Sequence, residues 1–146
     1  MIESNSIPIL KLKEFLIVSI QTDLHDRMAE QLQYDILNKI SETAAKGVLI
    51  DISALEMVDS FIGRTLADTA KMASTLDSDI VIVGMKPAVA ITLVELGLSL
   101  GKVHTALNLD EGYEFLKNLI DEEMQLNGEN PTQETEVKKP DASGSD

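Results

Sequence analysis

The segment 56–66, EMVDSFIGRTL, brings an acid, a hydroxyl and a base close together at Asp59, Ser60 and Arg64. Asp and Ser are favoured helix N-caps, because their side-chain oxygens accept hydrogen bonds from the free amides of the first helical turn. A capping role is the simple structural interpretation of the pair. Only one of the two is the cap, however. If it is Asp59, Ser60 stands at the first helical position with its hydroxyl free for solvent or for another protein.

The same segment is suited to carry a phosphate on Ser60. Arg64 lies one turn later on the same helix face, where it can pair with an anion, and a helix N-terminus favours negative charge by about 0.3–1 kcal/mol. Gly63 lies inside the expected helix, where glycine costs roughly 1 kcal/mol relative to alanine. We interpret it as a position that a partner approaches closely. Thr65 and Thr92 stay open as secondary phosphorylation sites.

The sequence contains no recognisable catalytic or metal-binding motif. The two histidines, His25 and His104, lie far apart along the chain, and there is no cysteine. The segment GLSLGKV (97–103) has one residue too few between its glycines for a phosphate-binding loop, and Val103 stands where that loop needs a hydroxyl. We therefore expect no enzymatic activity, no metal and no cofactor.

The charge of the chain argues against binding to nucleic acids or anionic membranes. Its 25 acidic and 12 basic residues give a net charge of −13, whereas both of those partners require a basic surface. The acidic surface serves solubility, and a sharper interpretation is that it selects a basic protein partner. The apolar stretch 88–100 contains Glu95 and is too short to span a bilayer. The N-terminus lacks the basic region of a secretory signal, so we expect a cytoplasmic protein.

Apolar blocks alternate with amphipathic segments, a pattern typical of an α/β domain. The expected strands are 7–13, 14–20, 48–52, 79–85 and 102–106, with a tight turn between the first two. The expected helices are 27–45, 60–76, 87–97, and a last one from Asn108 or Asp110 to Leu126. We expect Gly47 to end the first helix, Pro87 to begin the third, and Asn108 with Glu111 to form a capping box on the last.

Each long helix is expected to bury one apolar stripe. The stripes comprise Met28, Leu32, Ile36, Ile40 and Ala44 in the first helix, Ile62, Leu66, Ala70 and Ala73 in the second, and Phe115, Leu116, Leu119 and Ile120 in the last. After residue 126 the composition becomes polar and acidic, with too few apolar side chains to offset the entropy of ordering. We expect a single domain over 1–126 and a disordered acidic tail over 127–146.

Three blocks of the sequence closely resemble one protein family. They are IPILKLKEFLIVSIQTDLHD (7–26), GVLIDISALEMVDSFIGRTL (47–66) and GMKPAVAITLVELGL (84–98). The sequence resembles stressosome co-antagonists of the RsbS type, which consist of a single STAS domain, over residues 6 to 120. The resemblance implies a mixed sheet of four to five strands, with the first strand antiparallel, flanked by about four helices.

The resemblance also implies a function. Proteins of this type are non-enzymatic scaffolds that assemble with sensor–STAS paralogues into a large complex and sequester a switch serine/threonine kinase. The kinase phosphorylates the serine of the Asp-Ser turn, here Ser60, and leaves, and a phosphatase resets the site. The alternative is a free anti-anti-sigma factor that binds an anti-sigma kinase one-to-one, since those proteins share the Asp-Ser turn. The stimulus, the stoichiometry and the downstream output stay open.

Overall fold

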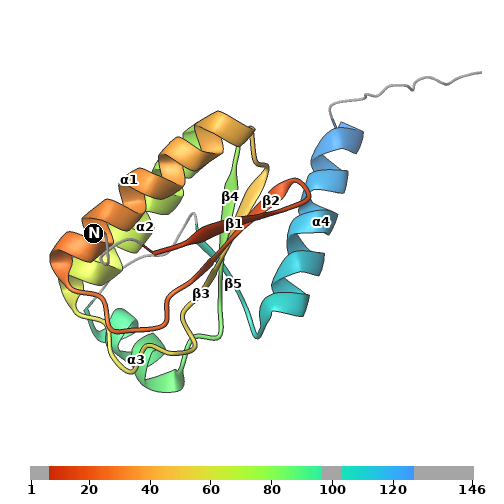
Figure 1. The fold of residues 1–146 in the computed structure, drawn as a ribbon. Coiled ribbons are helices and arrows are strands. Elements are labelled where there is room, and N and C mark those ends of the chain that lie inside the picture. The colour runs from red at the N-terminus through yellow and green to blue at the C-terminus, as the bar shows by residue number, and fades with distance from the viewer. Residues whose placement is uncertain (1–6, 97–102, 127–146) are drawn as a thin grey trace, which may run out of the picture. The chain divides into compact units, whose positions relative to one another are not determined.

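The computed structural model describes residues 7–96 and 103–126. Strands and helices alternate along most of the chain, as the sequence pattern predicts for an α/β domain (Figure 1). The elements in chain order are β1 (Ile9–Leu12), β2 (Phe15–Ser19), α1 (Asp26–Thr43), β3 (Gly47–Asp51), α2 (Ser60–Thr75), β4 (Asp79–Val83), α3 (Pro87–Glu95), β5 (Val103–Ala106) and α4 (Leu109–Leu126).

The strands form one mixed sheet in the order β1-β2-β3-β4-β5. β1 runs antiparallel to β2, and Lys13 makes the tight turn between them with a left-handed φ of 56°. All the other neighbours are parallel, and their register aligns Ile17 with Leu49 and Leu49 with Val81. The expected mixed sheet with an antiparallel first strand is therefore confirmed, and it has five strands.

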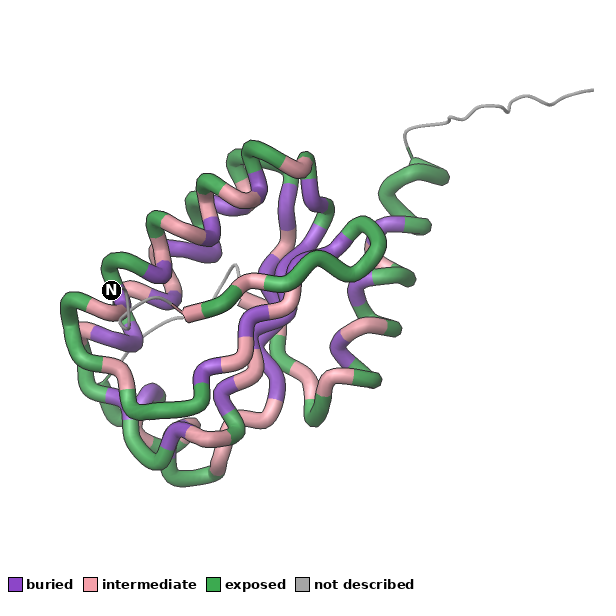
Figure 2. Tube along the Cα trace, viewed as in Figure 1, coloured by how far each residue is buried: buried purple, intermediate pink, exposed green. Residues whose placement is uncertain are grey.

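One face of the sheet packs against α1 and α2, which lie side by side (Figure 1). Leu32 and Ile36 of α1 and Leu66 of α2 are buried in the same apolar cluster as alternate residues of the inner strands. A hydrogen bond of 2.9 Å from Gln33 Nε2 to the buried Thr69 Oγ1 joins the two helices. Figure 2 shows the buried residues following the strands and the two helices.

The opposite face of the inner strands is also buried. Leu49 and Val83 lie under the first turn of α4, so a Cβ added at Gly112 would come within 2.7 Å of both side chains. The Tyr113 ring meets the Phe15 ring edge-on, with their centroids 5.4 Å apart. Burial on both faces explains why β3 and β4 read as continuous apolar runs instead of alternating ones.

The chain divides into two compact units, residues 1–113 and 114–146, and the boundary falls inside α4. In the described part of the second unit, Leu116 and Ile120 are buried and Leu119 is half-buried, as expected. Phe115 is 39% exposed, so its expected burial was wrong. Its side chain points about 100° around the helix from Leu116, away from the stripe that Leu116 and Ile120 share.

The end of α1 also differs from the expectation. The helix ends at Thr43, and Ala44 adopts a left-handed φ of 56° while its N–H donates to Ile40 O at 2.7 Å. Gly47 is therefore not the helix stop; it is the first residue of β3, where it pairs with Phe15. The three residues from 44 to 46 suffice to turn the chain from helix to strand, without a glycine.

The buried stripes of the first two helices are largely as expected. In α2, Ile62, Leu66, Ala70 and Ala73 are all buried. In α1, Ala29 is buried in place of Met28, which is half-buried, and Ala44 is exposed. The expected ends at Gly97 and at residue 102, and the whole of 127–146, lie outside the described residues.

Gly84 follows β4 directly and has a left-handed φ of 76°. A Cβ at this position would lie 2.8 Å from Ser53 Cβ and 3.1 Å from Asp51 Oδ1. We expect Gly84→Ala to lower the free energy of unfolding by about 1–3 kcal/mol, because a non-glycine residue is strained in that backbone conformation. Urea denaturation followed by circular dichroism measures the loss.

The control is the double variant Gly84→Ala with Ser53→Gly, compared with Ser53→Gly alone. Removing the Ser53 Cβ relieves the closest contact and leaves the backbone strain and the 3.1 Å approach to Asp51 Oδ1, so the cost of the alanine becomes smaller. If Gly84→Ala unfolds at the same urea concentration as the original protein, the close approach of the two chain segments is wrong.

Candidate functional site

The loop between β3 and α2 carries the segment singled out in the sequence. It begins with a turn in which Ser53 N–H donates to Asp51 Oδ1 at 2.9 Å, and Leu55 N–H then donates to Ile52 O at 2.9 Å. Leu55 and Val58 are buried, with 1% and 3% of their surface exposed. The loop is therefore anchored in the core at two points, and it delivers the next residues to a defined position.

Asp59 is the N-cap of α2. Its backbone is extended, and its Oδ1 accepts a hydrogen bond of 2.9 Å from Ile62 N–H. The backbone carbonyl of Asp59 accepts from Gly63 N–H, also at 2.9 Å, as the first bond of the helix. Of the two capping alternatives, the structure shows the one that assigns the cap to Asp59. Ser60 consequently occupies the first helical position.

The Ser60 side chain is exposed, and no hydrogen bond engages its hydroxyl within the described part of the chain. Arg64 is exposed one helical turn later, and among residues 7–96 and 103–126 the structure shows no ion pair to its guanidinium. Side chains four residues apart on a helix are neighbours, with about 5–6 Å between their Cβ atoms. An anion on Ser60 would thus find Arg64 within reach.

Gly63 is buried in α2. Its placement on the inner side of the helix means that a partner docking on the exposed surface meets Ser60 and Arg64 but not Gly63 in this conformation. The sequence pattern could not show this, because an isolated glycine in a helix is equally consistent with tight internal packing.

Thr65 and Thr92 differ from Ser60 in their surroundings. The Thr65 hydroxyl donates to Phe61 O at 2.8 Å, and the Thr92 hydroxyl donates to Ala88 O at 2.9 Å. Both threonines lie inside helices and are half-buried. Their hydroxyls are held against the helix backbone, whereas the Ser60 hydroxyl faces solvent at a helix end.

A cleft of about 200 Å³ lies beside the Asp59 cap, and we call it the Met57 cleft. One side comes from the loop between β2 and α1, and the other comes from the loop between β3 and α2 with the first turn of α2. The lining residues are Asp23, Leu24, Leu55, Met57, Val58, Asp59 and Ile62. Sequence analysis missed this cleft, because Asp23 and Leu24 belong to a different crossover from the others.

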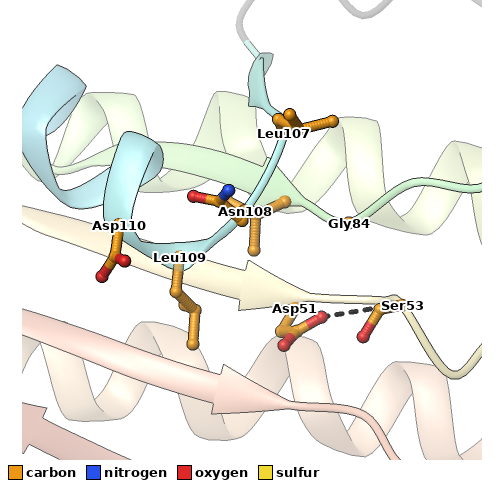
Figure 3. Close-up of a pocket in the computed structure, with 8 residues that line it drawn as sticks. Asp51, Ser53, Gly84, Leu107, Asn108, Leu109 and Asp110 are labelled. Carbon is orange, nitrogen blue, oxygen red and sulfur yellow. Dashed lines mark hydrogen bonds between the residues drawn. The ribbon is translucent and has the colours of Figure 1, made fainter.

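A second hollow, of about 390 Å³, lies at the carboxyl ends of β3, β4 and β5 (Figure 3). Asp51 and Ser53 approach it from β3, Gly84 from β4, and Asn108 with Asp110 from the start of α4. Asn108 Oδ1 accepts from Glu111 N–H at 2.9 Å, which confirms Asn108 as the cap of α4. Two carboxylates and no base line the hollow, so it disfavours anions.

The described residues contain no cluster of three or more His, Cys, Asp or Glu side chains that could hold a metal ion. His25 is exposed at the start of α1, and His104 is half-buried in β5. One ion pair does connect the site to its surroundings. Lys86, the residue before the expected helix start at Pro87, places its Nζ 2.6 Å from Glu56 Oε2 in the β3–α2 loop.

Comparisons with known proteins agree on one family. The family model of the STAS domain matches residues 6–112. Among curated proteins, the RsbT co-antagonist protein RsbRA of Bacillus subtilis (strain 168) is 25% identical over 101 residues, which are 69% of this chain. The chain spans only 37% of that relative's length.

Solved structures give closer matches. RsbS of Moorella thermoacetica, in a serine-to-glutamate variant, is 44% identical, with a TM-score of 0.71 over 79% of this chain and 97% of that one. A chain of the stressosome, described as a signal integration and transduction hub, is also 44% identical, with a TM-score of 0.66 over 77% and 98%. The anti-sigma factor antagonist SpoIIAA, in its unphosphorylated form, shares the fold at 13% identity and a TM-score of 0.64, covering 77% and 96% of the two chains.

These matches confirm the resemblance on which the sequence-based expectations relied. In the part of the chain that the structure covers, no helix is both long and apolar enough to cross a bilayer.

The geometry predicts different costs for replacing the two residues of the Asp-Ser turn. Asp59→Ala removes the hydrogen bond to Ile62 N–H and should lower the free energy of unfolding by about 1 kcal/mol. Asp59→Asn retains a capping oxygen and should cost much less. Ser60→Ala removes an exposed hydroxyl outside the cap, so we expect a change within about 0.5 kcal/mol.

Urea denaturation of the three variants tests this order. If Ser60→Ala is as destabilising as Asp59→Ala, Ser60 contributes to the cap, and the assignment of a free hydroxyl is wrong.

Proposed function

This chain belongs to the STAS domain family, and we propose that it serves as a non-enzymatic scaffold and negative regulator of a stress-response signalling complex, the stressosome. It holds a switch serine/threonine kinase while Ser60 carries a free hydroxyl, and it releases the kinase when Ser60 is phosphorylated. A phosphatase resets the site. The proposal includes co-assembly with a sensor–STAS paralogue, a cytoplasmic location, and no role for cofactors, metals, nucleic acids or membranes.

The likeness to Moorella RsbS carries the proposal. An identity of 44% over nearly the whole of that chain goes beyond a shared fold, and the matched stressosome chain has the same identity. The relative RsbRA is matched over only part of its length, which supports a longer paralogue as the co-scaffold. The domain expected over 1–126 extends beyond the family match at residue 112, so its boundary with the acidic tail stays part of the proposal.

Ser60 is the residue that the site geometry favours for phosphorylation. It is exposed, it lies outside the capping hydrogen bond, and it begins a helix whose N-terminus favours negative charge. A phosphate adds about −1.5 to −2 charges and three strong acceptor oxygens. The domain can accept this group without losing the Asp59 cap.

Two neighbours act on that phosphate in opposite directions. Asp59 is adjacent, and over about 6 Å, at an effective dielectric constant of 20–80, each pair of like unit charges costs roughly 0.7–2.8 kcal/mol. Arg64 and the helix N-terminus offset part of this cost within the domain. We therefore expect the phosphorylated domain to stay folded.

A kinase surface that fits the neutral Ser60 hydroxyl has no matching groups that would offset the charge of a phosphate. A penalty of only about 2–3 kcal/mol at the interface weakens binding by roughly 30- to 150-fold, since each 1.4 kcal/mol is a factor of ten. That range is sufficient for a switch, and it needs no change of fold.

A free anti-anti-sigma factor is the alternative function. The likeness to SpoIIAA is at the level of the fold alone, since the two sequences are 13% identical. Particle size distinguishes the two functions, because a scaffold assembles into a large complex whereas the alternative forms small complexes with one kinase.

We predict that the cognate switch kinase phosphorylates the protein at Ser60. Ser60→Ala should abolish the modification and keep the kinase bound. Ser60→Asp should fold normally and bind the kinase more weakly, although one carboxylate imitates a phosphate imperfectly. Mass-spectrometric mapping of the phosphate, together with affinities from calorimetry, measures both effects.

Thr65→Ala and Thr92→Ala are the matched controls, because both remove a hydroxyl that the helix backbone already engages. They should leave the modification unchanged. Phosphate found on either threonine, or equal labelling of Ser60→Ala and the original protein, would contradict the mechanism.

We further predict that co-expression with a sensor–STAS paralogue yields a particle far larger than a dimer. Exposed apolar side chains on α3, with Ile91 56% and Val94 77% exposed, provide surface for such an assembly. Multi-angle light scattering of the co-purified proteins gives the mass. A small heterodimer as the sole species would favour the anti-anti-sigma alternative.

A further inference from the structure

The Met57 cleft opens beside the residue that we propose to be phosphorylated, since Asp59 lines the cleft and Ser60 follows it directly. Its most buried lining residues, Leu55, Val58 and Ile62, each have 3% or less of their surface exposed. A buried water needs a volume of about 10–15 Å³, whereas this cleft offers about 200 Å³. It has room for a whole side chain.

We propose that the Met57 cleft receives one bulky apolar side chain of the switch kinase, flanked on the kinase by a lysine or arginine that meets Asp23. The inference rests on the proposed function and adds to it the surface through which the kinase is held. The kinase thereby contacts the Asp-Ser turn from the side of the cleft, with its apolar side chain near Asp59, the residue before Ser60.

Met57 and the buried apolar residues beside it favour an apolar occupant of the cleft. Met57 has 75% of its surface exposed at the rim, directly beside residues that are almost completely buried. Methionine is flexible and polarizable, and it is frequent on protein surfaces that must adapt to a partner. An inserted apolar side chain would cover Met57 and Leu24 and would contact the apolar floor.

The acidic residues that line the cleft favour a positively charged group on the partner. Asp23 and Asp59 both line the cleft, and none of the lining residues carries a positive charge. Asp59 uses Oδ1 to cap α2, whereas Asp23, on the other loop, is exposed and has no hydrogen bond or ion pair to another described residue, so we assign the base to Asp23. The net charge of −13 also attracts a basic surface at longer range.

This arrangement explains how a phosphate can expel a partner that an acidic rim attracts. The base of the kinase is paired with Asp23 on the β2–α1 loop, whereas the phosphate would stand on Ser60, the first residue of α2. An apolar side chain that enters the cleft removes water from the phosphate without replacing its hydrogen bonds, and burying an uncompensated charge is strongly unfavourable. Release therefore follows from lost hydration at the mouth of the cleft.

The test measures binding of the unphosphorylated full-length protein to its purified cognate switch kinase by surface plasmon resonance. We expect Met57→Ala to weaken binding by about tenfold, mainly through faster dissociation. Met72→Ala is the matched control, because Met72 is also exposed, at 43%, and lies on α2 about 18 Å along the helix axis from Ser60. Its affinity should equal that of the original protein.

A second pair of variants separates a local contact from a general charge effect. Asp23→Asn should weaken binding several-fold even at high salt, where long-range attraction is screened. Asp26→Asn removes the same charge three residues later, outside the lining of the cleft, and should have little effect at high salt. Thermal unfolding of all four variants checks that they remain folded.

The outcomes distinguish a failure of the proposed function from a failure of the cleft as the docking site. If the original protein does not bind the kinase, the proposed function fails, and this inference fails with it. If it binds but Met57→Ala and Asp23→Asn bind equally well, the cleft is not the docking site, and the proposed function stands. If Met57→Ala instead reduces the particle mass in light scattering while kinase affinity is unchanged, a second STAS chain occupies the cleft and the inference is overturned.

Discussion

Burial of the central strands on both faces is the constraint on which the rest of the first unit depends. β3 and β4 pack against α1 and α2 on one side and against the first turn of α4 on the other. The contact with α4 is so close that no side chain would fit at position 112, which is a glycine. The ends of these strands therefore have little freedom. The β3–α2 loop is further anchored by Leu55 and Val58, so the position of Ser60 follows from the core through a short and well-packed connection.

The Asp59 cap keeps the stability of α2 independent of the proposed phosphorylation site at Ser60. Because the hydrogen bond that satisfies Ile62 N–H comes from Asp59, the hydroxyl of Ser60 carries no structural duty. A modification at Ser60 can thus change what the surface binds while the helix and its packing stay as they are. If the two residues exchanged roles, phosphorylation would remove a cap worth about 1 kcal/mol, and binding and stability would change together.

The sequence was sufficient for most of the architecture, because apolar periodicity reflects which faces are buried. It predicted the strands, the stripe of α2, the start of α3 at Pro87 and the cap of α4 at Asn108. It failed at Gly47, since Ala44 takes the left-handed conformation despite its Cβ, and at Phe115. The Met57 cleft could not be predicted from the sequence, because its lining combines Asp23 of the β2–α1 loop with residues of the β3–α2 loop. The proposed role of Ser60 came from the family resemblance, because residue spacing alone does not distinguish a serine that is phosphorylated from one that caps a helix.

The overall charge of the chain makes a local mechanism necessary. With a net charge of −13, one more phosphate changes the long-range field only modestly, and exposed charges are screened over about 8 Å at physiological salt. A change at Ser60 therefore acts mainly on groups close to it, which include Asp59, the adjacent residue that lines the Met57 cleft, and Arg64, one helical turn later. Arg64 would offset part of the charge of a phosphate on Ser60. The apolar cleft is the part of this neighbourhood where added charge and lost hydration bear directly on a bound partner.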